Sequence, residues 1–213
     1  SFPLVDCHGM PLDSARMDAL DCDISRVVVQ HSVFAHNGND GLDLMTTQAL
    51  VTDCRFEGCG DKGISIGEGS QMIALRSVFD GCNKAMEAKD GSVAVAANCE
   101  LRHCKKAINA YKKNWRYDAG GSIAVHKSIV LDNEALPTAD RWSRAQLIDC
   151  QVQGELVAEY DQEYVDGHST RIKNSAQMLG CDPGKRAQDR APMPFPSDLL
   201  VLEGFAGKAW QTV

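Results

Sequence analysis

The chain has 213 residues and a formal net charge of −7, with 44% hydrophobic and 24% charged residues. These proportions are typical of a folded globular protein, and no apolar run approaches the roughly 20 residues of a membrane-spanning helix. The negative charge disfavours nucleic acid as a partner, although Lys105, Lys106, Lys112 and Lys113 form a local basic strip. We therefore expect a folded chain with neither a membrane span nor a nucleic-acid partner.

A segment of about 22 residues recurs between Ser32 and Val152. Each copy ends in a small residue, a variable residue and a hydrophobe. Successive hydrophobes are 22 or 23 residues apart, except for one interval of 29 residues. A fixed period in this range indicates stacked supersecondary units. The hydrophobes that define the period are Phe34, Phe56, Phe79, Leu101, Val130 and Val152.

Short strands with one buried face are expected after the first four of these hydrophobes. The residues eight and ten positions later are apolar and the residue between them is not, as in Leu42 and Leu44 or Ile64 and Ile66. Helical repeats need about 33 residues or more, with apolar residues three or four apart. The sequence therefore predicts a parallel β-solenoid in which like residues stack about 4.8 Å apart.

This pattern resembles the right-handed parallel β-helix family, the fold of pectate lyases and tailspikes, from about Leu12 to Val152. The resemblance implies an all-β, single-stranded parallel β-helix of about six coils within residues 1–152. After Val152 the pattern stops, so residues 153–213 are predicted to be an irregular extension. Its apolar segment from Leu199 to Phe205 is suited to cap the open end of the solenoid.

The nine cysteines fall mostly in two stacked columns. The pattern favours buried thiols that act as small hydrophobes. No paired Cys-x-x-Cys spacing indicates a zinc site. A disulfide between neighbouring coils, such as Cys59 with Cys82, is the alternative. The serine column contains Cys54, Cys99 and Cys150, and the column of Asn37 contains Cys59, Cys82 and Cys104.

The 29-residue interval contains an insertion from Lys112 to Gly121. Insertions in solenoids project from one face, which is often the binding face. Trp115 or Tyr117 can stack on a sugar ring, and Arg116 can bind a carboxylate with two hydrogen bonds. We expect these three residues to bind substrate together with Lys106 and Glu87. The alternative is that Trp115 folds down over the adjoining coil.

Charged residues occupy stacked columns around the segment from Asn39 to Leu44. Stacking predicts that one face carries carboxylates at one end and lysines at the other, either as a site or as a solubilising charge ladder. Glu87 and Asp90 are close enough in the pattern to pair with the lysines. The column of Asn39 continues as Asp61, Asn83 and Lys105, that of Asp40 as Lys62, Lys84 and Lys106, and that of Asp43 as Ser65, Glu87 and Asn109.

The string Asn39-Asp40-Gly41-Leu42-Asp43-Leu44 resembles the Asp-Asp-Gly-Leu-Asp-Leu calcium motif of one family of β-helical pectate lyases, with Asn39 in place of the first aspartate. Clustered carboxylates are the ligands that Ca²⁺ prefers. The resemblance implies a Ca²⁺ cofactor held by Asp40, Asp43 and Asp61. It also implies that Lys84 or Lys62, with a lowered pKa, abstracts a proton from a uronate.

Two functions agree with these patterns. The first is a β-helix module that recognises an acidic polysaccharide, or serves as a structural part of a larger extracellular or cell-surface protein with further domains. The second is a calcium-assisted polysaccharide lyase that cleaves uronate-containing glycans by β-elimination. The first residues, from Ser1 to Asp6, show no signal peptide, which is expected of a mature form or an excised domain.

Overall fold

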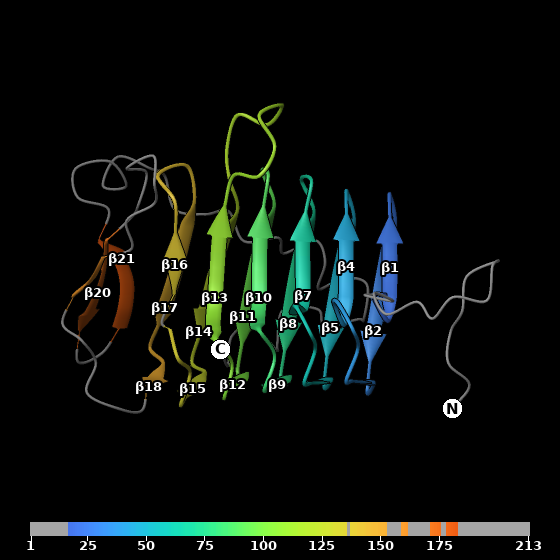
Figure 1. Ribbon diagram of the computed structural model, residues 1–213, viewed down its shortest axis with the longest axis horizontal. Helices are drawn as coiled ribbons and strands as arrows, with labels where there is room; N and C mark the ends of the chain where they lie inside the picture. The colour runs from blue at the N-terminus through green and yellow to red at the C-terminus, as the bar shows by residue number, and fades with distance from the viewer. Residues whose placement is uncertain (1–16, 136, 153–158, 162–170, 176–177, 183–213) are drawn as a thin grey trace, which may run out of the picture.

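The structure is a computed structural model that describes residues 17–135, 137–152, 159–161, 171–175 and 178–182. From Leu20 to Val152 the chain winds through about six coils, and the coils contribute in turn to three parallel sheets. The strands of one sheet stand side by side along the long axis of the molecule, from β1 to β16 (Figure 1). The predicted all-β parallel solenoid is confirmed.

Every coil passes through sheets 1, 2 and 3 in that order. Sheet 1 contains β1 (Leu20–Asp23), β4 (Leu42–Met45), β7 (Lys62–Gly67), β10 (Lys84–Lys89), β13 (Lys106–Tyr111) and β16 (Thr138–Ala139). Sheet 2 contains β2 (Arg26–Gln30), β5 (Gln48–Thr52), β8 (Gln71–Leu75), β11 (Val93–Ala97), β14 (Ser122–His126) and β17 (Arg144–Ile148). Sheet 3 contains β3 (Val33–Ala35), β6 (Arg55–Glu57), β9 (Val78–Asp80), β12 (Glu100–Arg102), β15 (Ile129–Leu131) and β18 (Gln151–Val152).

Three further strands lie in the segment that the sequence marks as irregular. They are β19 (Glu159–Asp161), β20 (Arg171–Ser175) and β21 (Met178–Asp182), which pair with one another in antiparallel fashion. β21 also pairs antiparallel with β17, so sheet 2 continues past the last parallel coil. The segment from Leu199 to Phe205, expected to cap the solenoid, lies outside the described residues.

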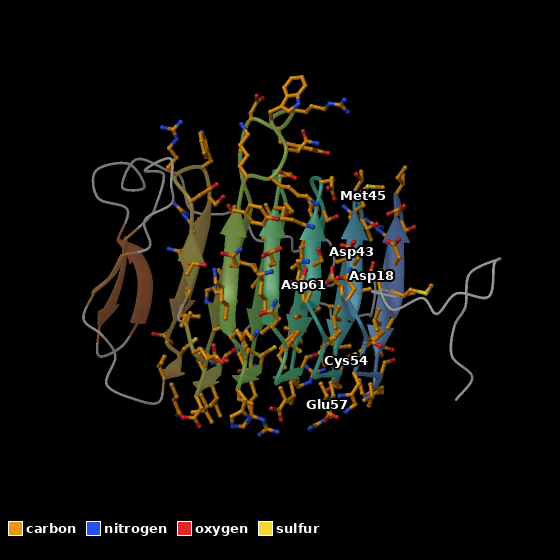
Figure 2. All side chains as sticks on the ribbon, viewed as in Figure 1. Asp18, Asp43, Met45, Cys54, Glu57 and Asp61 are labelled. Carbon is orange, nitrogen blue, oxygen red and sulfur yellow. The ribbon has the colours of Figure 1, made fainter. Side chains whose placement is uncertain are left out.

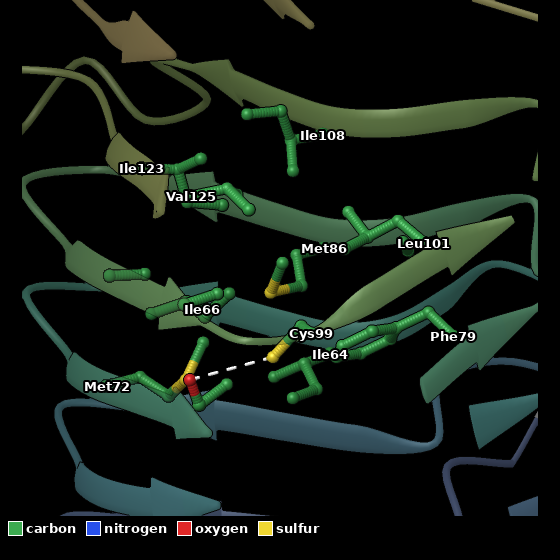
Figure 3. Packing of buried hydrophobic residues seen from close by; sticks show 14 of the residues in the cluster. Ile64, Ile66, Met72, Phe79, Met86, Cys99, Leu101, Ile108, Ile123 and Val125 are labelled. Carbon is green, nitrogen blue, oxygen red and sulfur yellow. Dashed lines mark hydrogen bonds between the residues drawn. The ribbon is translucent and has the colours of Figure 1, made fainter. Parts of the chain in front are cut away.

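The core consists of columns of like residues stacked in register. Ile64 of β7 lies between Leu42 and Met86, and all three side chains are fully buried. Ile64 and Met86 are seen among the packed core residues in Figure 3. On sheet 3 the rings of Phe34 and Phe56 stack with centroids 4.9 Å apart and planes 5° apart, and Phe56 stacks on the next phenylalanine at the same distance. The alternation of apolar residues in each strand thus produces a continuous core.

The chain turns its corners with residues in the left-handed conformation. Between sheets 2 and 3 the corner residue has φ between 43° and 55° in every coil. Asp and Asn tolerate this conformation better than most side chains do. The column is therefore polar for a conformational reason as well as for its exposure, which sequence analysis did not anticipate. Its members are His31, Asp53, Arg76, Asn98, Lys127 and Asp149.

The residue after each corner points inward and bonds to its neighbours in the stack. The Oγ of Ser77 accepts a hydrogen bond from the Cys54 amide at 3.2 Å and donates one to the Leu75 carbonyl at 2.9 Å. The Cys99 thiol donates to the Ala74 carbonyl at 3.7 Å, the dashed line in Figure 3. The seven cysteines between Cys22 and Cys150 are free thiols and six of them are buried, so the inter-coil disulfide is not formed there.

Candidate functional site

The charged columns lie on the outer surface of sheet 1, which we call the charged face. Strand pairing sets Lys84 between Lys62 and Lys106, and Glu87 between Ser65 and Asn109, as the sequence predicts. Because the apolar residues of each strand point into the core, the residues between them point outward. Asp43 and Asp61 lie in the middle band of this face, whereas Met45 lies closer to its upper edge (Figure 2).

Lys62 is the centre of an ion-pair cluster on the charged face. Its Nζ lies 3.3 Å from both carboxylate oxygens of Asp40 and 3.8 Å from Oε1 of Glu87, and it also donates to Asp61. Burial lowers the pKa of Lys62, but the hydrogen bond to Asp61 and the charges of Asp40 and Glu87 outweigh burial and raise it above its usual value. Lys62 is therefore a buried, protonated cation.

Asp40 is held by this cation yet strongly desolvated. Its carboxylate also accepts the Lys62 backbone amide at 3.0 Å, and only 2% of the residue is exposed. Burial raises the pKa of Asp40 to about 6, and the Lys62 charge opposes this rise only in part. A carboxyl group in this state is a buried partner of Lys62, not an exposed ligand.

Asp61 bridges two lysines of neighbouring coils. Its Oδ1 lies 2.8 Å from Nζ of Lys84, and its other oxygen accepts from Lys62. Burial alone would raise the pKa of Asp61, but the hydrogen bonds from Lys62 and Lys84 lower it to about 2. Lys84 also lies 3.4 Å from Oε2 of Glu87. Both lysines expected to act as bases are thus paired with carboxylates.

Glu87 extends this network towards the last coils. Its Oε2 accepts from Nδ2 of Asn109 at 2.8 Å, and the Oδ1 of Asn109 accepts from the hydroxyl of Thr138. Glu87 is 2% exposed and is enclosed by these partners and the two lysines. Its position favours a role in holding the face together over direct contact with a sugar.

Two other predicted residues of the face stand outside the cluster. Lys106 is half-buried and forms no ion pair with any residue that the structure describes. Burial and the nearby Lys84 charge lower the pKa of Lys106, with Glu87 opposing them. Asp43 is also half-buried. The turn before Asp43 is held by Asp18, whose Oδ1 accepts a hydrogen bond from the Asp40 amide at 2.9 Å.

The insertion after β13 projects beyond the ends of the strands (Figure 1). Its base is held by two buried carboxylates. Oδ1 of Asp90 accepts the amides of Lys113 and Asn114 at 2.7 and 2.8 Å, and Oδ2 of Asp140 accepts the Lys112 amide at 2.8 Å. Asp90, expected to pair with the lysine side chains, thus anchors the loop backbone instead.

The three predicted sugar-binding residues of this loop have different environments. Trp115 is 84% exposed, and the Arg116 guanidinium lies 5.8 Å from the centroid of its ring. Trp115 therefore does not fold down over the adjoining coil. Tyr117 is half-buried, and a Cβ placed on Gly91 would lie 3.8 Å from Cδ1 of its ring. Of the three predicted residues, Trp115 and Arg116 are exposed and Tyr117 is not.

The donor set on the charged face does not fit Ca²⁺ as it stands. Calcium takes six to eight oxygen ligands. Two of the three expected ligands, Asp40 and Asp61, hold the Lys62 ammonium between them. In the part of the chain that the structure describes, no three His, Cys, Asp or Glu side chains converge as metal ligands do. We therefore derive no chemical step through calcium.

Sequence analysis overlooked a second outward column on this face. Met45 pairs with Gly67, and Lys89 pairs with Tyr111, two positions beyond the column of Asp43. Lys89 is 6% exposed. The alternation of inward and outward residues could have identified this column, because Lys89 follows Met86 and Ala88 at the outward position.

The three parallel sheets and in-register stacking define a parallel β-solenoid protein. A family model described as right handed beta helix region matches residues 17–152, more than half of the chain. The chain belongs to this family, and the predicted right-handed coil is confirmed. Neither the comparison with curated proteins nor that with solved structures found a match. Among the described residues, no helix has the length and apolar character needed to cross a membrane.

Proposed function

We propose that the chain is a β-helix module that binds an acidic polysaccharide through the charged face and the projecting loop. The observation that carries this proposal is the 84% exposure of Trp115 on a loop whose base is fixed by buried carboxylates. An exposed indole on a rigid support offers a flat apolar surface to a sugar ring with little loss of conformational entropy on binding.

The charges beside the loop favour an acidic ligand. Arg116 lies next to the indole, and a guanidinium can form two hydrogen bonds with one carboxylate. Lys106 is a further cation without an ion-pair partner in the described residues. Lys62 and Lys84 are neutralised by their own carboxylates and serve as the support of the face.

This function implies an extracellular or cell-surface location, where the protein would meet acidic glycans. It also suits a module within a larger protein, in which the solenoid presents one binding face and other domains supply further activities. The lyase that the calcium motif implies is less well supported, because Lys62 is protonated and Lys84 is ion-paired.

The test is binding to acidic polysaccharides, measured by affinity electrophoresis in gels that contain polygalacturonate, alginate or hyaluronate. Trp115→Ala is expected to weaken retardation about tenfold without changing the melting temperature, because the ring is exposed. Val33→Ala, which removes a 64% exposed side chain from sheet 3, is the matched control and should bind as the wild type does.

Two results would overturn this function. Retardation by no acidic polymer, or equal retardation of Trp115→Ala and the wild type, would remove the proposed binding surface. A calcium-dependent rise in the ultraviolet absorbance of unsaturated uronates, lost in Lys84→Ala, would replace the binding module with a lyase.

A further inference from the structure

Lys89 is a largely buried lysine that has no counter-ion among the residues that the structure describes. Only 6% of the residue is exposed, and its Nζ forms neither an ion pair nor a hydrogen bond within the described residues. The other buried lysine of sheet 1, Lys62, is surrounded by three carboxylates. The two lysines are both largely buried, but within the described part of the chain Lys62 has carboxylate partners and Lys89 has none.

The head of Lys89 rests over Gly67 of the preceding coil. A Cβ at Gly67 would lie 3.3 Å from Cε of Lys89, which is tighter than an ordinary contact, and 3.6 Å from its Nζ. Glycine therefore leaves the space that the ammonium occupies. In the same outward column Met45 lies on one side of Gly67, and Tyr111 lies beyond Lys89.

A second unsatisfied polar group lies on the same strand as Gly67. Ser65 is completely buried, and its Oγ has no hydrogen-bond partner in the described part of the chain. Because Ile64 and Ile66 point into the core, Ser65 and Gly67 both face outward. A hydroxyl donor and an ammonium donor thus flank one short stretch of β7.

The Lys89 ammonium has no carboxylate partner within the described residues, and a buried hydroxyl without a partner, such as that of Ser65, carries a desolvation penalty. An anion bound between them would satisfy both groups at once, since both donate hydrogen bonds. The position also adjoins the loop, because Lys89 directly precedes Asp90, the carboxylate that anchors the backbone of Lys113 and Asn114.

We propose that Lys89 and Ser65 form an anion-binding site over Gly67, which takes the carboxylate or sulfate group of an acidic glycan whose neighbouring sugar reaches Trp115. The inference rests on the proposed function and adds to it the residues that recognise the acidic group. Tyr111, next to Lys89 in the stack, is positioned to flank the bound group.

The test uses Lys89→Met, an apolar side chain of similar length. Calorimetric titrations of the full chain with a trigalacturonate, a sulfated trisaccharide and a neutral trisaccharide measure binding. We expect at least a tenfold loss of affinity for the acidic ligand that the wild type binds. The melting temperature should change little, because the substitution breaks no ion pair within the described residues and retains most of the buried stem of the side chain. Gly67→Ala should weaken binding in the same direction by displacing the ammonium.

Lys84→Met is the matched control. It removes a lysine that pairs with Asp61 and Glu87, so it should lower the melting temperature. If the wild type binds an acidic trisaccharide and Lys89→Met binds it equally well, the anion site is wrong while the binding function stands. If Lys89→Met lowers the melting temperature as much as Lys84→Met, Lys89 is structural and the site is also wrong. If the wild type binds no acidic ligand, the proposed function is itself wrong.

Discussion

Lys62 and Asp40, one coil apart in the stack, form an ion pair in which Nζ lies 3.3 Å from each carboxylate oxygen. Asp61 and Glu87 surround the same ammonium, so the centre of the charged face is compensated within the protein. This arrangement makes Lys62 a structural cation. It also distinguishes Lys62 from Lys89, which has no carboxylate partner among the residues that the structure describes.

Removal of the Lys62 charge should destabilise the fold strongly. Lys62→Met leaves Asp40 and Glu87 buried without their cation, and breaking a buried pair in this way costs about 3–5 kcal/mol. Urea denaturation at neutral pH measures the change in the free energy of unfolding. Lys105→Met, at an exposed position of the neighbouring column, is the control and should change the free energy by less than about 0.5 kcal/mol. Equal effects of the two substitutions would contradict the ion-pair cluster.

Asp40 should make stability depend on pH between about 4 and 6. Its folded-state pKa of about 6 lies above the ordinary value of 3.8, so the folded state binds this proton more tightly than the unfolded state. Its stabilising contribution is complete below pH 4 and is lost as pH rises through 6. Relative to Asp40→Asn, the wild type should lose roughly 2–3 kcal/mol of unfolding free energy over this range.

Asp61 should act with the opposite sign and at lower pH. Its pKa of about 2 lies below 3.8, so its contribution is present above pH 4 and is lost as pH falls towards 2. Denaturant titrations of Asp61→Asn and Asp40→Asn across pH 2–7 separate the two effects. The prediction is wrong if both variants differ from the wild type over the same pH interval.

The aromatic stack on sheet 3 should contribute strongly to stability through its central ring. Phe56 is fully buried between Phe34 and Phe79. Phe56→Ala should therefore lower the free energy of unfolding by about 3–5 kcal/mol, because it leaves a cavity that rigid coils cannot close. Phe56→Leu, which retains most of the volume, should cost less than half as much in the same denaturation experiment. Similar losses for the two variants would show that the coils relax around the site.

Asp90 should control the order of the projecting loop. Asp90→Ala removes the acceptor of the Lys113 and Asn114 amides, so we expect faster tryptic cleavage after Arg116 and weaker glycan binding. Limited proteolysis followed by mass spectrometry measures the first effect. Asp118→Ala, at an exposed position of the same loop, should be cleaved at the wild-type rate. Unchanged cleavage in Asp90→Ala would show that other contacts order the loop.

The repeat was sufficient to predict the coils and the stacking of like residues. Once Phe34, Phe56 and Phe79 define the period, the register that sets Lys62 beside Lys84 follows, because parallel coils stack equivalent positions. The inward ladder of serines and cysteines follows for the same reason. These features depend on local alternation and period alone.

The pairing within the charged face depends on more than register. Side-chain conformation decides that Asp61 bridges two lysines, and that Asp90 accepts backbone amides of the loop and does not pair with Lys62 or Lys84. The exposure of Trp115 and the packing of Tyr117 likewise depend on how the insertion closes. The polar corners could have been assigned more fully, because Asp53, Asn98 and Asp149 are residues that favour the left-handed conformation.

The most direct test of the central claim compares the binding of polygalacturonate and of its carboxyl-reduced, neutral counterpart to the wild-type chain, with calcium and with chelator. Binding through uncompensated cations and an exposed indole predicts retention of the acidic polymer, loss of binding on carboxyl reduction, and no effect of the chelator. Equal binding of both polymers, or binding of the acidic polymer that the chelator abolishes, would contradict the account.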